Sequence, residues 1–264
     1  MSTSLPPADL TMVVPTYNER DRLAELVTAL FRQADQAGIA LELVVVDDHS
    51  PDGTGALADE LARTHRMVVV HRAGKLGLGT AVVEGFGRAS AAVLGVMDAD
   101  FSHPPALVPR MYAAFTATGA DVLVASRYVP GGSTPDWPWS RRLMSRVACL
   151  LARPLSPVRD AASGFFLIRR SVAEGVSIKA GGFKICLELL VRAWPRRIVE
   201  LPYRFDDREQ GESKMNRREA AGYLFQLKDL LLVRWTGGRR PRREYRRLTP
   251  DEVRAFGPPT QAAR

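Results

Sequence analysis

Short apolar runs alternate with helical patterns through the first half of the chain, and this alternation restricts the fold more than any other feature. The runs are continuously apolar, as in strands that are buried on both faces of a sheet. The predicted strands are residues 11–15, 41–47, 67–71, 93–98 and 121–125. The predicted helices between them are residues 19–37, 54–64, 77–90 and 105–118. This order predicts an α/β fold with a mostly parallel sheet flanked by helices.

Two of the predicted strands end on carboxylates. Asp47 and Asp48 follow one apolar run, and Asp98 and Asp100 follow another. Open parallel sheets bind their ligands beyond the carboxyl ends of the strands. Carboxylate oxygens suit a hard divalent cation, which can also bridge the protein to a diphosphate. A turn that caps the next helix would explain Asp98-Ala99-Asp100 without any ligand.

Two further motifs are consistent with a nucleotide at this edge. In "VPTYNE", residues 14–19, Tyr17 and Glu19 are predicted to line a nucleotide pocket, although Asn18 and Glu19 could simply begin a helix. "AGKLGLGTA", residues 73–81, matches neither the dinucleotide fingerprint nor a P-loop. Lys75 within it is predicted to meet a nucleotide phosphate, or else is an ordinary loop lysine.

The alternation stops after Tyr128, where a segment rich in Gly, Pro and Trp predicts a loop. The remaining predicted elements are a helix at 141–153, a strand at 163–170, a helix at 184–194, an extended segment at 197–205 and a helix at 219–235. The last of these has more apolar residues than one core-facing stripe requires, and we expect a C-terminal amphipathic helix that can lie on a membrane.

The charge is concentrated near the C-terminus. The net charge is +8, and residues 234–247 hold seven arginines and one glutamate, or +6. We expect an N-terminal tail (1–9), one domain (10–235) and a basic, flexible tail (236–264). The basic segment could be merely solvated, or could bind an anionic membrane surface. Nucleic acid is not expected as a partner, because no aromatic-rich basic motif accompanies the charge.

Cysteine content and hydropathy bear on the compartment. Cys149 and Cys186 are far apart and fit no metal spacing, which favours a reducing cytosolic environment. No apolar run reaches the roughly 20 residues needed to cross a bilayer. The chain is therefore not expected to cross a membrane by itself, although it can lie on one.

Together the motifs resemble family-2 glycosyltransferases of the GT-A fold, and within them the dolichol-phosphate (polyprenol-phosphate) mannose synthases. The motifs that carry the resemblance, in family order, are "VPTYNE", "VVDDHSPDGT", "KLGLGTA", "MDADFSHPP", "ASRY", "SGF" and "DREQGESK". The resemblance covers about residues 10–235. It implies a metal-dependent, inverting transfer of a hexose, mannose from GDP-mannose, to a polyprenyl or dolichyl monophosphate. Mg²⁺ or Mn²⁺ would be the cofactor, and a membrane protein is a further candidate partner. Because the implied acceptor is a lipid, we expect the protein at the cytoplasmic face of a membrane, bound peripherally.

The resemblance also implies roles for individual residues. Nucleotide-sugar contacts fall on Pro15, Tyr17, Glu19, Val46, Asp48, Asp98, Ala99 and Asp100. Metal contacts fall on Asp98, Asp100 and Ser102. The catalytic set is Asp98, Asp100, Arg127, Arg208 and Lys214, and the acceptor phosphate falls to Arg127, Arg141, Ser145, Arg208 and Lys214.

One segment departs from the family pattern. Relatives often read Asp-x-Thr-Ser-Gly-Phe-Arg, whereas Ala162 and Phe166 replace the threonine and the arginine here. No role follows for this segment beyond Asp160 and Ser163. A transferase that moves glucose from UDP-glucose to undecaprenyl phosphate or a soluble acceptor is the alternative enzyme. A non-catalytic nucleotide-sugar-binding or scaffold protein, and a nucleic-acid-binding protein, are the alternatives from other classes.

Overall fold

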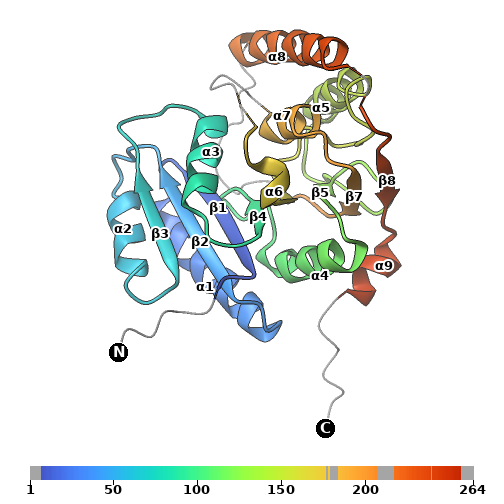
Figure 1. The fold of residues 1–264 in the computed structure, drawn as a ribbon. Coiled ribbons are helices and arrows are strands. Elements are labelled where there is room, and N and C mark those ends of the chain that lie inside the picture. Colours follow the sequence, from blue (N-terminus) through green and yellow to red (C-terminus); the bar gives the residue numbers. More distant parts are fainter. Residues whose placement is uncertain (1–6, 177, 179–183, 207–216, 239, 257–264) are drawn as a thin grey trace.

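The computed structural model describes residues 7–176, 178, 184–206, 217–238 and 240–256 (Figure 1). Its centre is an eight-stranded sheet in the order β3-β2-β1-β4-β6-β5-β7-β8. The strands are β1 Leu10–Thr16, β2 Leu41–Asp47, β3 Met67–His71, β4 Val93–Val96, β5 Val122–Ser126, β6 Phe166–Arg169, β7 Arg197–Pro202 and β8 Glu244–Arg247. Only β6 runs against its neighbours, β4 and β5, among the strands of the described ranges. The predicted mostly parallel α/β sheet is confirmed.

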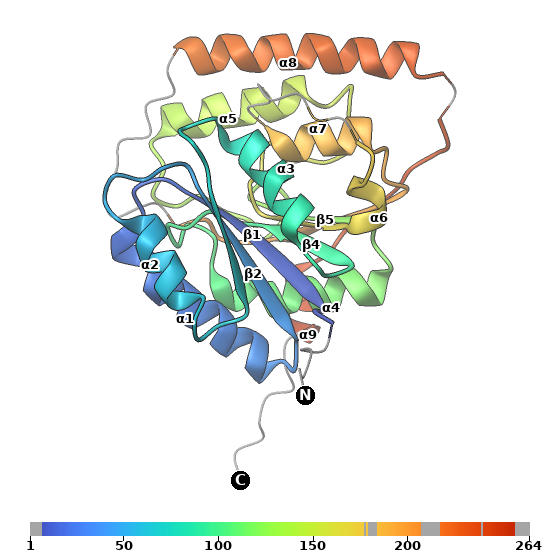
Figure 2. The same ribbon diagram turned by 60° about the vertical axis from the view of Figure 1, so that its left-hand side comes forward.

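Helices cover both faces of this sheet (Figures 1 and 2). They are α1 Arg20–Gln36, α2 Thr54–Leu61, α3 Leu78–Arg88, α4 Val108–Thr118, α5 Trp139–Leu151, α6 Arg170–Ala173, α7 Ile185–Arg192, α8 Arg217–Thr236 and α9 Pro250–Ala255, with a 3-10 turn at Pro105–Leu107. The side chains of each strand alternate between two cores. Met12 packs with α1 and α4 on one face, and its neighbour Val13 packs with α3 on the other.

The strand β4 ends two residues earlier than predicted. It leaves the ladder after Val96, and the chain then turns, with Phe101 in the left-handed region at φ 62°. Asp98 and Asp100 therefore lie in this turn and not on the strand itself. The turn brings backbone and side chains of the motif to the carboxyl edge of the sheet.

The predicted helix near the C-terminus exists, but its apolar residues occupy two faces. Tyr223, Leu227 and Leu230 are buried, whereas Phe225 and Trp235 are 74% and 80% exposed. Both views show α8 lying across the outer side of α5 and α7 (Figures 1 and 2). The Tyr223 hydroxyl donates a hydrogen bond to the carbonyl oxygen of residue 148 in α5, at 2.7 Å. One face of α8 thus packs on the domain and the other is left bare.

The expectation of a flexible tail from residue 236 is wrong for residues 240–256. Strand β8 pairs in parallel with β7 and extends the sheet, and α9 begins with a complete capping box between Thr249 and Glu252. Leu248 and Val253 are buried in the core. Pairing with β7 satisfies backbone groups, so this basic segment folds although it has few apolar residues.

No helix in the described part of the chain is both long enough and apolar enough to cross a membrane. Cys149 and Cys186 are both buried and free.

Candidate active site

The first two strands bring the predicted nucleotide residues together at the carboxyl edge of the sheet. Pro15 of β1 pairs with Val46 of β2. Asp47, next to Val46, is buried and accepts hydrogen bonds from the Ser50 amide at 2.9 Å and from its hydroxyl at 2.5 Å. Asp47 of the Asp47-Asp48 pair therefore holds the turn that follows β2.

Asp48 has a partner that the sequence motifs do not contain. Its carboxylate lies 2.5 Å from the Nη1 of Arg72, whose side chain is 2% exposed. Arg72 also hydrogen-bonds the Thr80 hydroxyl and the carbonyl oxygen of Gly77, at the start of α3. Arg72 thus ties Asp48 to the glycine-rich segment, and its guanidinium fixes where the carboxylate points.

Tyr17 and Lys75 meet above the same edge. The Lys75 ammonium lies 4.0 Å from the centre of the Tyr17 ring, a cation–π contact. Tyr17 is 38% exposed, so both groups remain accessible to a ligand. Glu19 donates its backbone N–H to the Thr54 hydroxyl at 3.0 Å, which links the start of α1 to the start of α2.

The turn after β4 presents two carboxylates in different environments. The side chain of Asp98 is 35% exposed, and Asp100 is 4% exposed. Asp100 accepts hydrogen bonds from the Ser102 amide at 3.0 Å and the Ser102 hydroxyl at 2.6 Å. The Ser102 hydroxyl thus donates its hydrogen bond to Asp100 and orients that carboxylate. Buried Ala99 lies between the two carboxylates.

His103 contacts both the backbone and the carboxylate of Asp98. The Asp98 amide donates to its Nδ1 at 2.9 Å, which leaves the ring proton on Nε2, 3.8 Å from the Asp98 carboxylate. Burial lowers the pKa of His103, although Asp98 and Asp100 act in the opposite direction. The ring also stacks on Phe165 at a centroid distance of 4.8 Å. A neutral, rigid imidazole therefore backs the carboxylate.

Arg127 is engaged within the protein. Its Nε and Nη2 each donate to Asp160 at 2.7 Å, and its amide donates to the same carboxylate at 2.9 Å. Asp160 is fully buried, and the Arg127 side chain is 9% exposed. Burial alone would lower the pKa of Arg127, but the Asp160 carboxylate outweighs it, and the pKa is raised. To contact a phosphate directly, the Arg127 guanidinium would have to bind the phosphate and Asp160 at the same time.

The segment that departs from the family pattern adjoins Asp98. A Cβ added at Gly164 would lie 3.5 and 3.6 Å from the two carboxylate oxygens of Asp98, and 3.3 Å from His103 Cε1. The Ser163 hydroxyl donates to the carbonyl oxygen of Ala125 at the end of β5. Phe166 is fully buried in β6, so the residue at this position serves the core. The segment thus walls the site, although its sequence alone did not give it a role.

Two of the predicted acceptor residues, Arg141 and Ser145, lie in the first half of α5. The Arg141 guanidinium lies 4.1 Å from the centre of the Trp137 ring, and Arg127 lies 5.2 Å from the same ring. Ser145, one turn further along α5, lies near enough to Tyr128 to influence the pKa of its hydroxyl, which burial raises. Arg208 and Lys214 lie outside the described residues.

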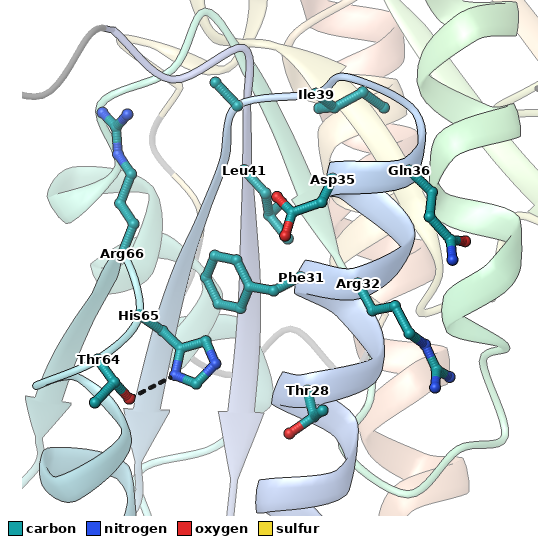
Figure 3. Close-up of a pocket in the computed structure, with 11 residues that line it drawn as sticks. Thr28, Phe31, Arg32, Asp35, Gln36, Ile39, Leu41, Thr64, His65 and Arg66 are labelled. Atoms are coloured by element: carbon teal, nitrogen blue, oxygen red, sulfur yellow. Dashed lines mark hydrogen bonds between the residues drawn. The ribbon is translucent and has the colours of Figure 1, made fainter.

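A pocket elsewhere in the molecule is not part of this site. Figure 3 shows Phe31 of α1 facing His65 in this pocket. The pocket has a volume of about 700 Å³, and the two ring centroids are 4.9 Å apart. Its lining comes from α1 and from the amino ends of β2 and β3. Since the candidate site lies at the carboxyl ends of the strands, the two are on opposite edges of the sheet.

Comparison with known proteins identifies relatives over most of the chain. The model of glycosyl transferase family 2 matches residues 11–177. A dolichol-phosphate mannosyltransferase of Pyrococcus furiosus is 40% identical over 234 residues, which are 86% of this chain and 64% of that protein. The polyprenol monophosphomannose synthase of Mycolicibacterium smegmatis is 41% identical over 83% of this chain and 86% of its own length. The chain thus spans slightly less than two thirds of the first relative and most of the second.

A solved structure shares the fold. Glucosyl-3-phosphoglycerate synthase from Mycobacterium tuberculosis, in complex with Mn²⁺, UDP and glucosyl-3-phosphoglycerate, has a TM-score of 0.61 at 20% identity. The likeness covers 86% of this chain and 80% of that chain. The predicted fold and the predicted resemblance to polyprenol-phosphate mannose synthases are confirmed by these comparisons.

Proposed function

Because the chain belongs to glycosyl transferase family 2, we propose that it transfers mannose from GDP-mannose to a polyprenyl or dolichyl monophosphate. The names of the relatives support mannose as the sugar and a polyprenyl phosphate as the acceptor. The observation that carries the proposal is the Asp98–Asp100 turn, which stands at the carboxyl edge of the sheet beside the nucleotide edge formed by β1 and β2. GDP as the nucleotide is part of the proposal.

The residues present fit a divalent ion, Mg²⁺ or Mn²⁺. Asp98 offers a partly exposed carboxylate, and Gly164 leaves the space beside it open. In the described ranges no cluster of three or more His, Cys, Asp or Glu could hold a metal. Asp98 and Asp100 would therefore hold the ion together with oxygen atoms of the nucleotide diphosphate. When bound, the ion supplies positive charge that stabilises the departing diphosphate. Ser102 would act through Asp100.

The protein needs no general base for this reaction. The second pKa of a phosphate monoester is about 6, so the acceptor is already a dianion at pH 7. His103 is neutral and buried against Asp98, which suits a group that positions a carboxylate. Attack on the sugar from the side opposite the diphosphate, through an oxocarbenium-like transition state, gives an inverted, β-linked product.

The acceptor phosphate would bind at the start of α5. Arg141 can offer its planar guanidinium while it stacks on Trp137. Arg127, held by Asp160, would supply positive charge to the site without leaving its partner. Arg208 and Lys214, from "DREQGESK", would complete the phosphate contacts as the family resemblance implies.

The lipid part of the acceptor would lie along α5 and α8. Cys149 is the only buried residue of α5, and Trp139, Leu143 and Leu150 are exposed. Phe225 and Trp235 of α8 are exposed as well, and we call these five exposed apolar side chains of α5 and α8 the apolar face. Such a surface fits a protein that lies on a bilayer, here its cytoplasmic face.

The experiment that tests the function is a transfer assay. The protein is incubated with radiolabelled nucleotide sugars, polyprenyl phosphate and Mg²⁺ or Mn²⁺, and label that enters the organic phase is counted. We expect label from GDP-mannose, loss of transfer in EDTA, and at least about a 100-fold loss in Asp100→Asn, the scale of removing one preorganised charge-stabilising group.

Asp35→Asn is the matched control, because Asp35 lines the pocket at the opposite edge of the sheet. Its rate should be unchanged. Label taken from UDP-glucose in place of GDP-mannose would favour the alternative transferase, and full activity in EDTA would exclude the metal.

A further inference from the structure

A second basic site lies away from the Asp98–Asp100 turn, where α5, α7 and α8 end. A pocket of about 340 Å³ is lined there by Arg153, Trp194, Arg234 and residues 240–243, among others. The described residues that line it include five arginines, Arg153, Arg234, Arg240, Arg242 and Arg243, and no Asp or Glu. We call it the arginine pocket.

Three of the guanidinium groups gather around one indole ring. Arg243 lies 3.4 Å from the centre of Trp194, and Arg234 and Arg240 each lie 4.8 Å from it. The indole N–H donates to the carbonyl oxygen of Pro241 at 3.0 Å, so the ring is fixed. The three positive charges repel one another at this spacing. In the described part of the chain, none of the three guanidinium groups forms an ion pair with a carboxylate.

Capping of helix ends explains only part of this cluster. Arg240 donates to the Val191 carbonyl at 2.8 Å, and Arg243 donates to the Leu190 carbonyl at 2.5 Å, which satisfies the last turn of α7. The Nε of Arg243 is nevertheless buried without a hydrogen-bond partner. Burial, together with Arg234 and Arg240, lowers the pKa of Arg243 to about 10. For Arg234 and Arg242 the described residues show no side-chain hydrogen bond. An anion would satisfy what the protein leaves open.

The arginine pocket is separate from the acceptor site and borders the apolar face. Arg141 stands at the start of α5 and Arg153 just past its end, about 18 Å apart at 1.5 Å per residue. Leu150 of α5 and Trp235 of α8, both strongly exposed, lie at the same helix ends as Arg153 and Arg234. A tryptophan beside arginines is typical of the level of lipid headgroups.

We propose that the arginine pocket binds the phosphate group of an anionic phospholipid while the apolar face rests on the bilayer. This proposal rests on the proposed function, in which the protein lies on a membrane. It adds a specific binding site for a lipid headgroup. A guanidinium group can bind two phosphate oxygens at once. Five guanidinium groups with no carboxylate beside them favour a headgroup with net negative charge over a zwitterionic headgroup. The bound lipid would hold the ends of α5 and α8 at the surface.

Vesicle flotation of the full chain tests this. Vesicles of phosphatidylcholine alone are compared with vesicles that also contain phosphatidylglycerol. Arg234→Gln/Arg242→Gln removes the two arginines without recorded side-chain hydrogen bonds, and we expect at least about a tenfold loss of affinity for the anionic vesicles, since each basic residue near such a surface contributes about 1 kcal/mol. Arg63→Gln/Arg88→Gln removes equal charge from two exposed positions, one in the turn after α2 and one at the end of α3, and should cost less than about threefold.

Three outcomes would overturn the proposal. Equal losses in the two double variants would mean that only total charge matters. No loss in either would mean that the pocket binds no lipid. Calorimetry with inorganic phosphate and with monomeric, short-chain phosphatidylglycerol distinguishes the sources, because equal affinity for both, without vesicle binding, would assign the pocket to free phosphate. Transfer to a short, water-soluble polyprenyl phosphate by the unchanged protein tests the proposed reaction independently of any vesicle.

Discussion

Arg127 and Asp160 form a buried pair that shapes the wall of the site. Two parallel hydrogen bonds join them, and Asp160 also receives the Arg127 amide. Asp160 in turn donates its amide to Glu200 of β7, at 3.0 Å. The pair therefore connects the end of β5, the segment before β6 and the strand β7. Its loss should lower the stability of the folded protein.

Asp160→Asn should lower the free energy of unfolding by about 3–5 kcal/mol, because it leaves the buried Arg127 charge without its partner. Urea unfolding followed by circular dichroism measures this. The control is Asp206→Asn, which breaks the exposed pair between Arg204 and Asp206 and should leave the midpoint unchanged. Similar midpoints for the two variants would show that the buried pair contributes little.

Gly164 stands where an added side chain would meet the Asp98 carboxylate. Alanine at this position would place a methyl group 3.3 Å from His103 Cε1 and within 3.6 Å of the Asp98 carboxylate. We expect Gly164→Ala to slow transfer at least about tenfold, since small displacements of a catalytic group are costly. Gly87→Ala, at an exposed site in α3 with nothing within 4 Å, should keep full activity. Equal rates in the two variants would mean that Asp98 tolerates the displacement.

At this scale the sequence predicted the carboxylates and missed their supports. Asp48, Asp98 and Asp100 were recognisable because each follows an apolar run. Arg72 stands outside any motif, and its contact with Asp48 spans 24 residues through the fold. A single arginine after a strand carries no signal that would distinguish it from a surface residue, so only the folded chain assigns it.

Strand β8 and the helices α6 and α9 are elements that the sequence did not predict. "EYRR" has no apolar alternation, so its charge predicted a tail although its backbone completes a sheet. The Tyr245 hydroxyl hydrogen-bonds Glu200 of β7, and Leu248 follows into the core. The first five strands, by contrast, were predicted within two residues at each end, because each is a continuous apolar run bounded by turn residues or charge.

A chain that ends at residue 238 should be less stable than one that ends at residue 256. The shorter chain loses β8, α9 and the buried side chains of Leu248 and Val253, each of which contributes about 1.5–3 kcal/mol. A loss of about 3 kcal/mol or more should lower the unfolding midpoint by at least about 6 °C in a protein of this size. Thermal unfolding by circular dichroism measures the difference. Identical midpoints would show that this segment adds nothing to the domain.

Over the whole molecule the candidate site and the apolar face meet at α5. Its first turn carries Arg141 beside Trp137, and Leu143 and Leu150 further along the helix are exposed. Helix α8 lies across the outer side of α5 (Figure 2). A lipid phosphate bound at Arg141 could therefore have its hydrocarbon chain along the same helix. In the proposed reaction the nucleotide sugar would bind from water at the edge formed by β1 and β2, and the lipid would lie along α5 and α8.

This arrangement predicts that damage to the apolar face depends on the length of the acceptor. Phe225→Ser/Trp235→Ser removes two exposed aromatic side chains, and burial of one large apolar side chain contributes about 1.5–3 kcal/mol. Transfer to a long polyprenyl phosphate in vesicles should fall at least about tenfold, and transfer to a short, water-soluble one should change far less. Phe225→Leu/Trp235→Leu keeps an apolar surface and should restore most of the long-chain activity. If the serine variant loses both activities to the same degree, α8 serves the fold or the chemistry and the lipid does not lie there.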